Sequence, residues 1–294
     1  EHHLDCFHSN YQYNQQSQLY YKKIINNFYD NIYFTNSKKV ISQNKDISPI
    51  FIIGLPRSGS TLVESLITSG KDKVKTCGES HVINMSILEQ IAPKIYKKEF
   101  NIEKFQFEID HINFSNSVIE RYNQFNFSKK FKNTIFVDKS LENFFNIKLI
   151  LKIFPNAKFI NTYRNSNDSI IAIYQSLLPE LSWTHRIEDI LDYINNYLKI
   201  INFFKMKYPN KIMDVDLEKL TSKSEIISKN IYKFCNLNWD KNSLNFYKRK
   251  DLFSKTLSFA QIREKIFNYD KKKYKNYYYL LDDFKKKYDW INNY

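Results

Sequence analysis

The chain has 294 residues, of which 43% are hydrophobic and 26% are charged, a balance that excludes general disorder and allows one large domain with its own core. The formal net charge of +14 suits a polyanionic partner, but a compositional bias toward Lys, Asn, Ile, Phe and Tyr explains it equally well. Cys6, Cys77 and Cys235 are too few and too scattered for a disulfide framework or a zinc cluster. Their odd number favours the cytoplasm, and no apolar run is long enough to span a membrane.

The first 45 residues are rich in Asn, Gln, Tyr and Lys. Their apolar side chains recur with a loose helical spacing between positions 11 and 34, which predicts one or two helices. We expect residues 1–45 to form a helical N-terminal extension, joined to a main domain at 46–294 by a connector at 42–49.

The main domain alternates short apolar runs with longer segments of helical periodicity. Strands are predicted at 50–53, 135–137, 158–163 and 211–215, and helices at 61–67, 141–154, 166–178 and 187–207. This alternation predicts an α/β fold with a central, mainly parallel sheet flanked by helices. The stretches 84–133 and 179–186 show no readable signature and are predicted to be loops that build an acceptor pocket, and the tail from 270 is predicted to be partly helical.

Residues 54–61 read Gly-Leu-Pro-Arg-Ser-Gly-Ser-Thr and lie between a predicted strand and a predicted helix. In this context backbone N–H groups can surround a phosphate at a helix N-terminus. The spacing matches a P-loop, except that Ser60 stands where a nucleoside-triphosphatase carries Lys. This difference argues against an ATPase or a kinase, and Arg57 offers a planar cationic fork instead. The alternative is a tight turn that binds no ligand.

This loop closely resembles the 5′-phosphosulfate loop of sulfotransferases that use PAPS (3′-phosphoadenosine 5′-phosphosulfate). It is most similar to bacterial sulfotransferases with N-terminal tetratricopeptide repeats and to the related tyrosylprotein sulfotransferases. The resemblance implies a P-loop-like sulfotransferase fold and transfer of a sulfuryl group from PAPS to an acceptor hydroxyl, without a metal. It assigns the 5′-phosphosulfate to six consecutive residues: Arg57, Ser58, Gly59, Ser60, Thr61 and Leu62.

A second match spans residues 154–165, Phe-Pro-Asn-Ala-Lys-Phe-Ile-Asn-Thr-Tyr-Arg-Asn, and resembles the strand and helix that bind the 3′-phosphate in this family. The resemblance implies that Arg164 binds that phosphate; the alternative is an exposed arginine at a strand end. The family usually has Ser eight residues later, where this chain has Ala172, with Ser169 nearby. This departure leaves open a homologue that binds the nucleotide without turnover.

Two further segments resemble the catalytic elements of the family. Residues 138–140, Asp-Lys-Ser, imply that Lys139 acts with Arg57 on the charge of the leaving oxygen, unless Lys139 only forms a structural ion pair. Residues 77–81, Cys-Gly-Glu-Ser-His, imply that Glu79 is the general base. His81 would face the same side of an extended segment and is the second candidate, and we favour Glu79.

The segment 256–263, Thr-Leu-Ser-Phe-Ala-Gln-Ile-Arg, is similar to one that closes over the nucleotide in this family, which implies a donor contact for Ser258. Lys265 and Asp270 stand where the family more often has Pro and Ser.

The competing class is a nucleic-acid-binding protein, because aromatic residues alternate with Lys between 271 and 288. No helix-turn-helix, zinc-finger or RNP signature accompanies them, so we do not expect a nucleic acid partner. The expected partners are the nucleotide donor and an acceptor with a hydroxyl group, which could be a protein tyrosine, a glycan or a small alcohol. The sequence leaves the choice of acceptor and the oligomeric state open.

Overall fold

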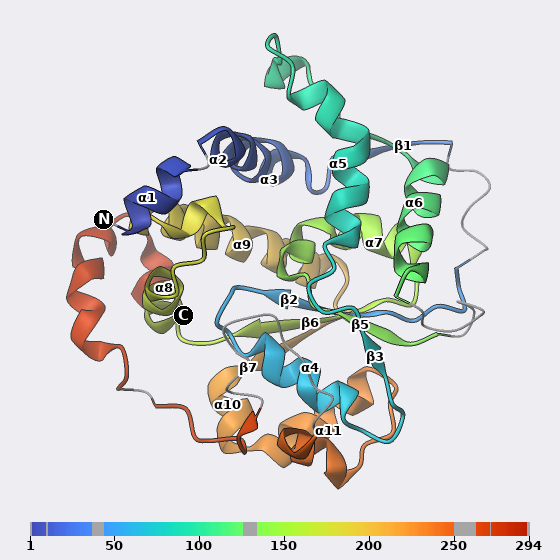
Figure 1. Ribbon diagram of the computed structural model, residues 1–294, viewed down its shortest axis with the longest axis vertical. Helices are drawn as coiled ribbons and strands as arrows, with labels where there is room; N and C mark the ends of the chain where they lie inside the picture. The colour runs from blue at the N-terminus through green and yellow to red at the C-terminus, as the bar shows by residue number, and fades with distance from the viewer. Residues whose placement is uncertain are drawn as a thin grey trace.

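The computed structural model describes residues 2–9, 11–36, 44–125, 134–249, 263–270 and 272–292 of the chain. Its centre is a five-stranded sheet in which all neighbouring strands are parallel (Figure 1). The strand order is β3 (Lys75–Thr76), β5 (Phe136–Asp138), β2 (Ile50–Gly54), β6 (Lys158–Tyr163) and β7 (Ile212–Asp216). The predicted α/β fold with a parallel sheet flanked by helices is confirmed. Among these five strands only β3 was not predicted, because its two polar residues carry no strand signal.

Alternate side chains of the central strand β2 enter two separate hydrophobic cores. Phe51 and Ile53 belong to the larger core, and Ile50 and Ile52 belong to the smaller one, because successive side chains of a strand face opposite sides of the sheet. All four are buried. Burial on both faces explains why this strand is a continuous apolar run in the sequence.

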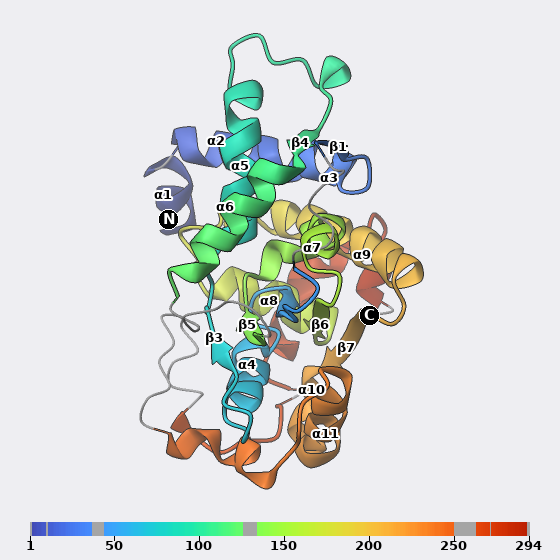
Figure 2. The same cartoon turned by 90° about the vertical axis from the view of Figure 1, so that its right-hand side faces the viewer.

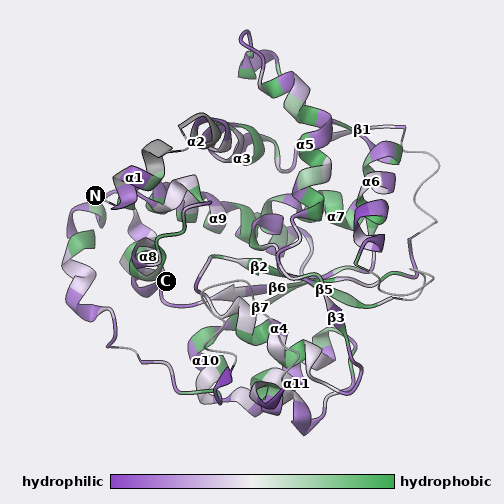
Figure 3. Ribbon diagram, in the orientation of Figure 1, coloured by the Kyte–Doolittle hydropathy of each residue, from purple (hydrophilic) through white to green (hydrophobic). Residues whose placement is uncertain are grey.

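Helices cover both faces of the sheet, and Figure 2 shows the two layers from the side. The layer over the smaller core holds α4 (Ser60–Thr68), α10 (Leu217–Ser222) and α11 (Ser224–Phe234), and the layer over the larger core includes α7 (Ile147–Ile153), α8 (Ser166–Gln175) and α9 (Ile187–Lys207). α7 is largely hydrophobic where it packs above the sheet (Figure 3). The helices predicted at 61–67, 166–178 and 187–207 are present as α4, α8 and α9. The one predicted at 141–154 starts as a 3₁₀ helix, Leu141–Asn146, before α7.

The N-terminal region packs on the layer of the larger core. It contains α1 (His2–Ser9), α2 (Tyr11–Gln18), a π-helical stretch (Leu19–Ile24) and α3 (Ile25–Phe28). Tyr20, Ile24 and Ile25 are buried in the larger core together with residues of the main domain. The next strand, β1 (Tyr33–Thr35), pairs in parallel with β4 (Glu108–Asp110) as a second, two-stranded sheet.

The stretch 84–133 was predicted to be a loop, and this prediction is wrong. Its described part holds most of α5 (Val82–Ile95), a short 3₁₀ helix (Ile102–Lys104), β4 and α6 (His111–Asn123). One face of α5 is buried through residues at intervals of four: Ile83, Ile87, Ile91 and Ile95. This periodicity is typical of an amphipathic helix and was present in the sequence.

The structure also describes 3₁₀ helices at Ser182–Thr184, Lys241–Lys248, Lys275–Phe284 and Asp289–Asn292. The predicted partly helical tail therefore contains 3₁₀ rather than α-helix. Among the helices that the structure describes, none combines the length and the apolar character needed to cross a bilayer.

Candidate active site

The candidate residues come from turns at the carboxyl ends of adjacent parallel strands. The phosphate loop follows β2, Lys139 follows β5, Glu79 lies just beyond β3 and Arg164 follows β6. Parallel strands end at the same edge of a sheet, so these turns meet in space, and that edge is where open α/β sheets bind ligands.

Two glycines shape the phosphate loop. Gly54 has φ 134°, and a Cβ there would lie 2.3 Å from the carbonyl oxygen of Thr162 in β6. Gly59 precedes α4 with φ 89°, and a Cβ there would lie 2.6 Å from Cδ1 of Leu217. Both positions therefore require glycine for conformation and for space. The loop leads directly into the N-terminus of α4, where backbone N–H groups favour an anion.

Ser58 and Arg57 have different environments within this loop. The Ser58 hydroxyl donates to the carbonyl oxygen of Leu55 at 2.6 Å and lies 2.8 Å from Oγ1 of Thr162. Ser58 is buried, so its hydroxyl ties the loop to β6. Arg57 has φ 64°, an uncommon left-handed conformation for a residue with a side chain.

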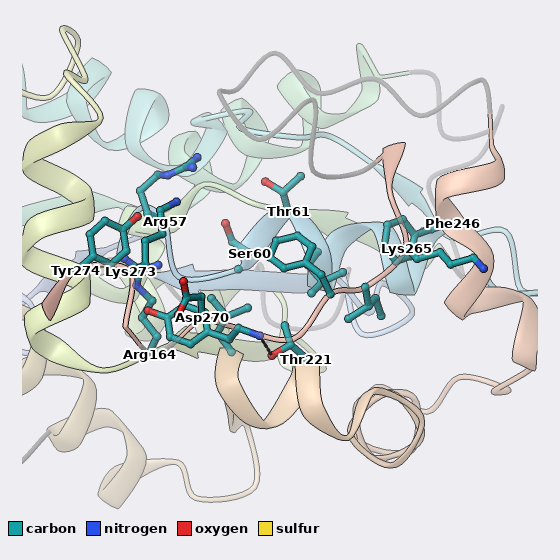
Figure 4. Close-up of a pocket in the computed structure, with 16 residues that line it drawn as sticks. Arg57, Ser60, Thr61, Arg164, Thr221, Phe246, Lys265, Asp270, Lys273 and Tyr274 are labelled. Atoms are coloured by element: carbon teal, nitrogen blue, oxygen red, sulfur yellow. Dashed lines mark hydrogen bonds between the residues drawn. The ribbon is translucent and has the colours of Figure 1, made fainter.

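A cavity of about 150 Å³ adjoins the loop (Figure 4). Six of its lining residues were predicted to bind the donor: Arg57, Gly59, Ser60, Thr61, Leu62 and Arg164. The facing wall comes from the C-terminal part of the chain and includes Tyr269, Asp270, Lys273 and Tyr274. In Figure 4, Arg57, Arg164, Lys273 and Tyr274 gather at one end of the cavity, and Ser60 and Thr61 lie near its middle. Lys273 and Tyr274 belong to the stretch 271–288, which was considered only for nucleic-acid binding, and Tyr269 was not singled out from the sequence.

The arginine end of the cavity is suited to an anion. Burial lowers the pKa of Arg57, and the neighbouring charge of Arg164 lowers it further. Arg164 is only 6% exposed, and its buried Nε atom has no hydrogen-bond partner among the residues that the structure describes. A buried donor without a partner is costly, and a phosphate oxygen would satisfy it. The residues present therefore fit a phosphorylated ligand.

Ala172 and Ser169 both lie on α8, the helix that begins two residues after Arg164. Ala172 is buried and cannot donate a hydrogen bond from its side chain. The Ser169 hydroxyl donates to the carbonyl oxygen of Asn165 at 3.0 Å, within its own helix. The hydroxyl of Ser169 is therefore engaged within α8 in this structure.

Glu79 and Lys139 are brought together by strand pairing. β3 and β5 are parallel neighbours, and the pairing continues past their ends through a hydrogen bond from the Lys139 N–H to the carbonyl oxygen of Gly78 at 2.8 Å. The Lys139 ammonium then lies 2.6 Å from Oε1 of Glu79. The Lys139 side chain is buried, whereas the Glu79 side chain is 39% exposed to solvent.

Glu64, which the sequence did not single out, is a second carboxylate beside Lys139. Its Oε2 atom lies 3.9 Å from the ammonium, and its Oε1 atom accepts a hydrogen bond from the Thr76 hydroxyl at 2.5 Å. Burial raises the pKa of Glu64, and the charge of Lys139 opposes that rise. Glu64 lies on α4 three residues after Thr61, a spacing that places both on one face of the helix and could have indicated a site residue.

Asp138 fixes the turn that carries Lys139. Its buried carboxylate accepts hydrogen bonds from the Ser80 hydroxyl at 2.5 Å, the Tyr122 hydroxyl at 2.7 Å and the N–H of Ser140 at 2.8 Å. Burial raises the pKa of Asp138, and these donors counteract the rise. The turns that hold Lys139 and Glu79 are thereby joined through one carboxylate.

His81 lies two residues beyond Glu79 and is paired with a different carboxylate. Its ring Nδ1 atom is 2.5 Å from Oε1 of Glu142, and the backbone N–H of His81 donates to the Ser140 hydroxyl at 2.8 Å. The hydrogen bond with Glu142 raises the pKa of His81 to about 9, against the opposing effect of burial. The imidazole is therefore a cation near neutral pH.

Ser258, the last predicted donor contact, lies outside the described residues, as do the residues around it. Lys265 and Asp270, further along the same region, line the cavity. Across the described ranges no group of three or more His, Cys, Asp or Glu side chains is arranged to hold a metal ion.

Comparison with known proteins gives matches to one family. A family model described as "Sulfotransferase family" matches residues 49–241. An uncharacterized protein of Aquifex aeolicus (strain VF5) is 27% identical over 237 residues, which cover 78% of this chain and 30% of that protein. The chain thus spans under a third of the length of this relative.

Two solved structures match most of the chain. The sulfotransferase domain of the olefin synthase of Synechococcus PCC 7002 superposes with a TM-score of 0.55 at 15% identity, over 78% of this chain and 87% of that one. The sulfotransferase STF1 of Mycobacterium tuberculosis H37Rv gives a TM-score of 0.46 at 11% identity, over 80% and 75% of the two chains.

Proposed function

Since the chain belongs to the sulfotransferase family, we propose that it transfers a sulfuryl group from PAPS to an acceptor hydroxyl. One observation carries the proposal: two arginines, Arg57 and Arg164, line one cavity at the phosphate loop, and the buried Nε of Arg164 has no partner within the described ranges of the chain. A nucleotide with phosphates at both its 5′ and 3′ positions would place one phosphate beside each arginine. PAPS has this pair of groups.

In this proposal the loop residues Arg57, Gly59, Ser60, Thr61 and Leu62 bind the 5′-phosphosulfate through backbone N–H groups and side chains. Ser58 contributes its backbone, because its hydroxyl is engaged with Leu55 and Thr162. Arg164 binds the 3′-phosphate with its guanidinium group, which is suited to phosphate oxygens. Ser258 remains a proposed donor contact.

The proposed reaction is an in-line displacement at sulfur. The acceptor oxygen forms a bond to sulfur, its proton passes to Glu79, and the bond between sulfur and the bridging oxygen of the donor breaks. PAP (3′-phosphoadenosine 5′-phosphate) leaves with the electron pair. Lys139 and Arg57 stabilise the negative charge that develops on the bridging oxygen, since electrostatics and positioning dominate such loose transition states.

Two observations favour Glu79 over His81 as the base. A general base must be unprotonated at the working pH, whereas the pKa of His81 is raised to about 9 by its contact with Glu142. Glu79 is a partly exposed carboxylate, and it already contacts Lys139. We propose that His81 acts as a cation near the acceptor and not as its base.

A nucleotide-binding homologue without turnover is the second candidate, and one observation favours it. Ala172 replaces the usual serine, and the hydroxyl of Ser169 is bonded within α8. A screen of acceptors with radiolabelled PAPS separates the two candidates. Labelled product with a tyrosine peptide, a glycan or a small alcohol would establish turnover, and PAP binding without any product would favour the second candidate.

We also propose that residues 1–45 are an extension of a sulfotransferase domain at 46–294. The cytoplasm remains the proposed compartment, because an odd number of cysteines favours a reducing environment.

The first test of the donor site is calorimetric titration with PAP, AMP and ATP. We expect PAP to bind far more tightly than AMP or ATP, and Arg164→Ala to weaken PAP binding by about 10- to 100-fold, because a hydrogen-bonded charge pair is lost. AMP, which has no 3′-phosphate, should be affected little. Arg121→Ala is the matched control, since Arg121 pairs with Glu89 on the surface. Equal binding of PAP and of ATP with magnesium would favour a kinase and contradict the proposal.

A further inference from the structure

Asp168 is a buried carboxylate that the proposed reaction does not use. It lies in the first turn of α8 and is 1% exposed. Two phenols from the C-terminal part of the chain donate hydrogen bonds to it: Tyr278 to Oδ1 at 2.5 Å, and Tyr269 to Oδ2. A buried carboxylate is stable only where donors satisfy it, so these tyrosines account for its presence there.

The same part of the chain surrounds Arg164. The guanidinium carbon lies 5.6 Å from the ring centre of Tyr269 and 5.2 Å from that of Tyr274, both within the range of cation–π contacts. Arg164 also donates from Nη2 to the backbone oxygen of Asp168. Asp168 therefore contacts the arginine through its backbone and one of the flanking tyrosines through its side chain.

We infer that Asp168 is a positioning residue of the donor site. Through Tyr269 and Tyr278 it fastens the C-terminal wall of the cavity to α8, and it thereby sets the direction of the Arg164 guanidinium group. The inference rests on the proposed function, in which Arg164 binds the 3′-phosphate of PAPS.

The energetic reason is preorganisation. A long arginine side chain loses rotamer freedom when it binds a phosphate, and a side chain already held between two rings loses less. If the carboxylate is neutralised, the two phenols lose charge-assisted hydrogen bonds and the wall is held less firmly. The nucleotide must then order both the wall and the arginine.

Calorimetric titration of PAP into three variants tests this inference. We expect Asp168→Asn to weaken PAP binding about tenfold and Tyr278→Phe about threefold, with a smaller change for AMP. Tyr278 is outside the group of residues that line the cavity, so a change in PAP binding caused by Tyr278→Phe would act through Asp168. Tyr279→Phe is the matched control, because that neighbouring side chain is exposed and should leave PAP binding unchanged.

A double-mutant cycle distinguishes positioning of Arg164 from general support of the fold. In the Arg164→Ala background, Asp168→Asn should cause no further loss of PAP affinity. An undiminished loss in that background, or unchanged PAP binding in both Asp168→Asn and Tyr278→Phe, would overturn the inference. Thermal melting without PAP identifies any variant that fails to fold. If Asp168→Asn does not fold, the PAP affinity of Tyr278→Phe tests the inference by itself. Absence of PAP binding by the unaltered protein would refute the proposed function instead.

Discussion

Lys139 lies between two carboxylates that differ in their access to solvent. Glu79 is 2.6 Å from the ammonium and partly exposed, whereas Glu64 is 3.9 Å away and largely buried. If Glu79 accepts the proton of the acceptor, it becomes neutral, and Glu64 is the carboxyl group left beside the lysine. Burial raises the pKa of Glu64, so the charge of Lys139 is what favours the ionised form that would balance this buried cation.

Substitution of the two candidate bases should have unequal effects. We expect Glu79→Gln to lower kcat by about 10²- to 10⁴-fold, the range for loss of a general base, with PAP affinity preserved. His81→Gln should lower kcat far less, because a protonated imidazole takes no proton from the acceptor. Rates of transfer from radiolabelled PAPS to the acceptor found by screening provide the measurement. A larger loss of kcat in His81→Gln than in Glu79→Gln would reverse the assignment.

The contact between His81 and Glu142 should make stability depend on pH. The pKa of His81 is raised in the folded state to about 9 from an ordinary 6.5, so folding favours the protonated form. The stabilisation is fully present below about pH 6.5 and is lost as the pH rises through about 9. His81→Gln should therefore lower the melting temperature at pH 6 and leave it nearly unchanged at pH 10. The effect should be modest, because the His81 side chain is half exposed. Equal destabilisation at both pH values would contradict the pairing.

At the scale of elements, the junction between β2 and the phosphate loop depends on one glycine. We expect Gly54→Ala to cost about 2 kcal/mol or more, because the added carbon would meet the Thr162 carbonyl at 2.3 Å in a backbone conformation that favours glycine. Gly78→Ala is the matched comparison. Gly78 has φ 60°, but an added carbon there would meet nothing within 4 Å, so only the backbone cost of about 1 kcal/mol applies. Urea unfolding measures both, and a smaller loss in Gly54→Ala would contradict the crowding.

The elements that could be predicted from sequence are those whose signal is local. The apolar run of β2 and the glycines that follow it occupy one short stretch, so the strand, the loop and its anion-binding character are readable together. The short strand β3 has no such signal. The two hydrogen bonds of Asp168 join residues 101 and 110 positions apart, and a spacing of that length leaves no pattern in one sequence. The helix α5 could have been predicted from its isoleucines.

At the scale of the whole molecule, the central sheet lies between two hydrophobic cores. Alternate residues of β2 enter opposite cores, and the site lies at the edge where both helical layers begin. The N-terminal helices contribute Tyr20, Ile24 and Ile25 to the larger core. The geometry of the donor cavity therefore depends on packing over both faces of the sheet.

The pairing of β2 with β6 has a consequence for the order of synthesis. Ile50 pairs with Lys158, more than a hundred residues later, and the tyrosines that hold the cavity wall come later still. At the usual 5–20 residues per second, a ribosome needs roughly 5 to 20 s to produce the partner of β2. During that interval the central apolar strand has no neighbour on that side, and it is a natural target for a chaperone.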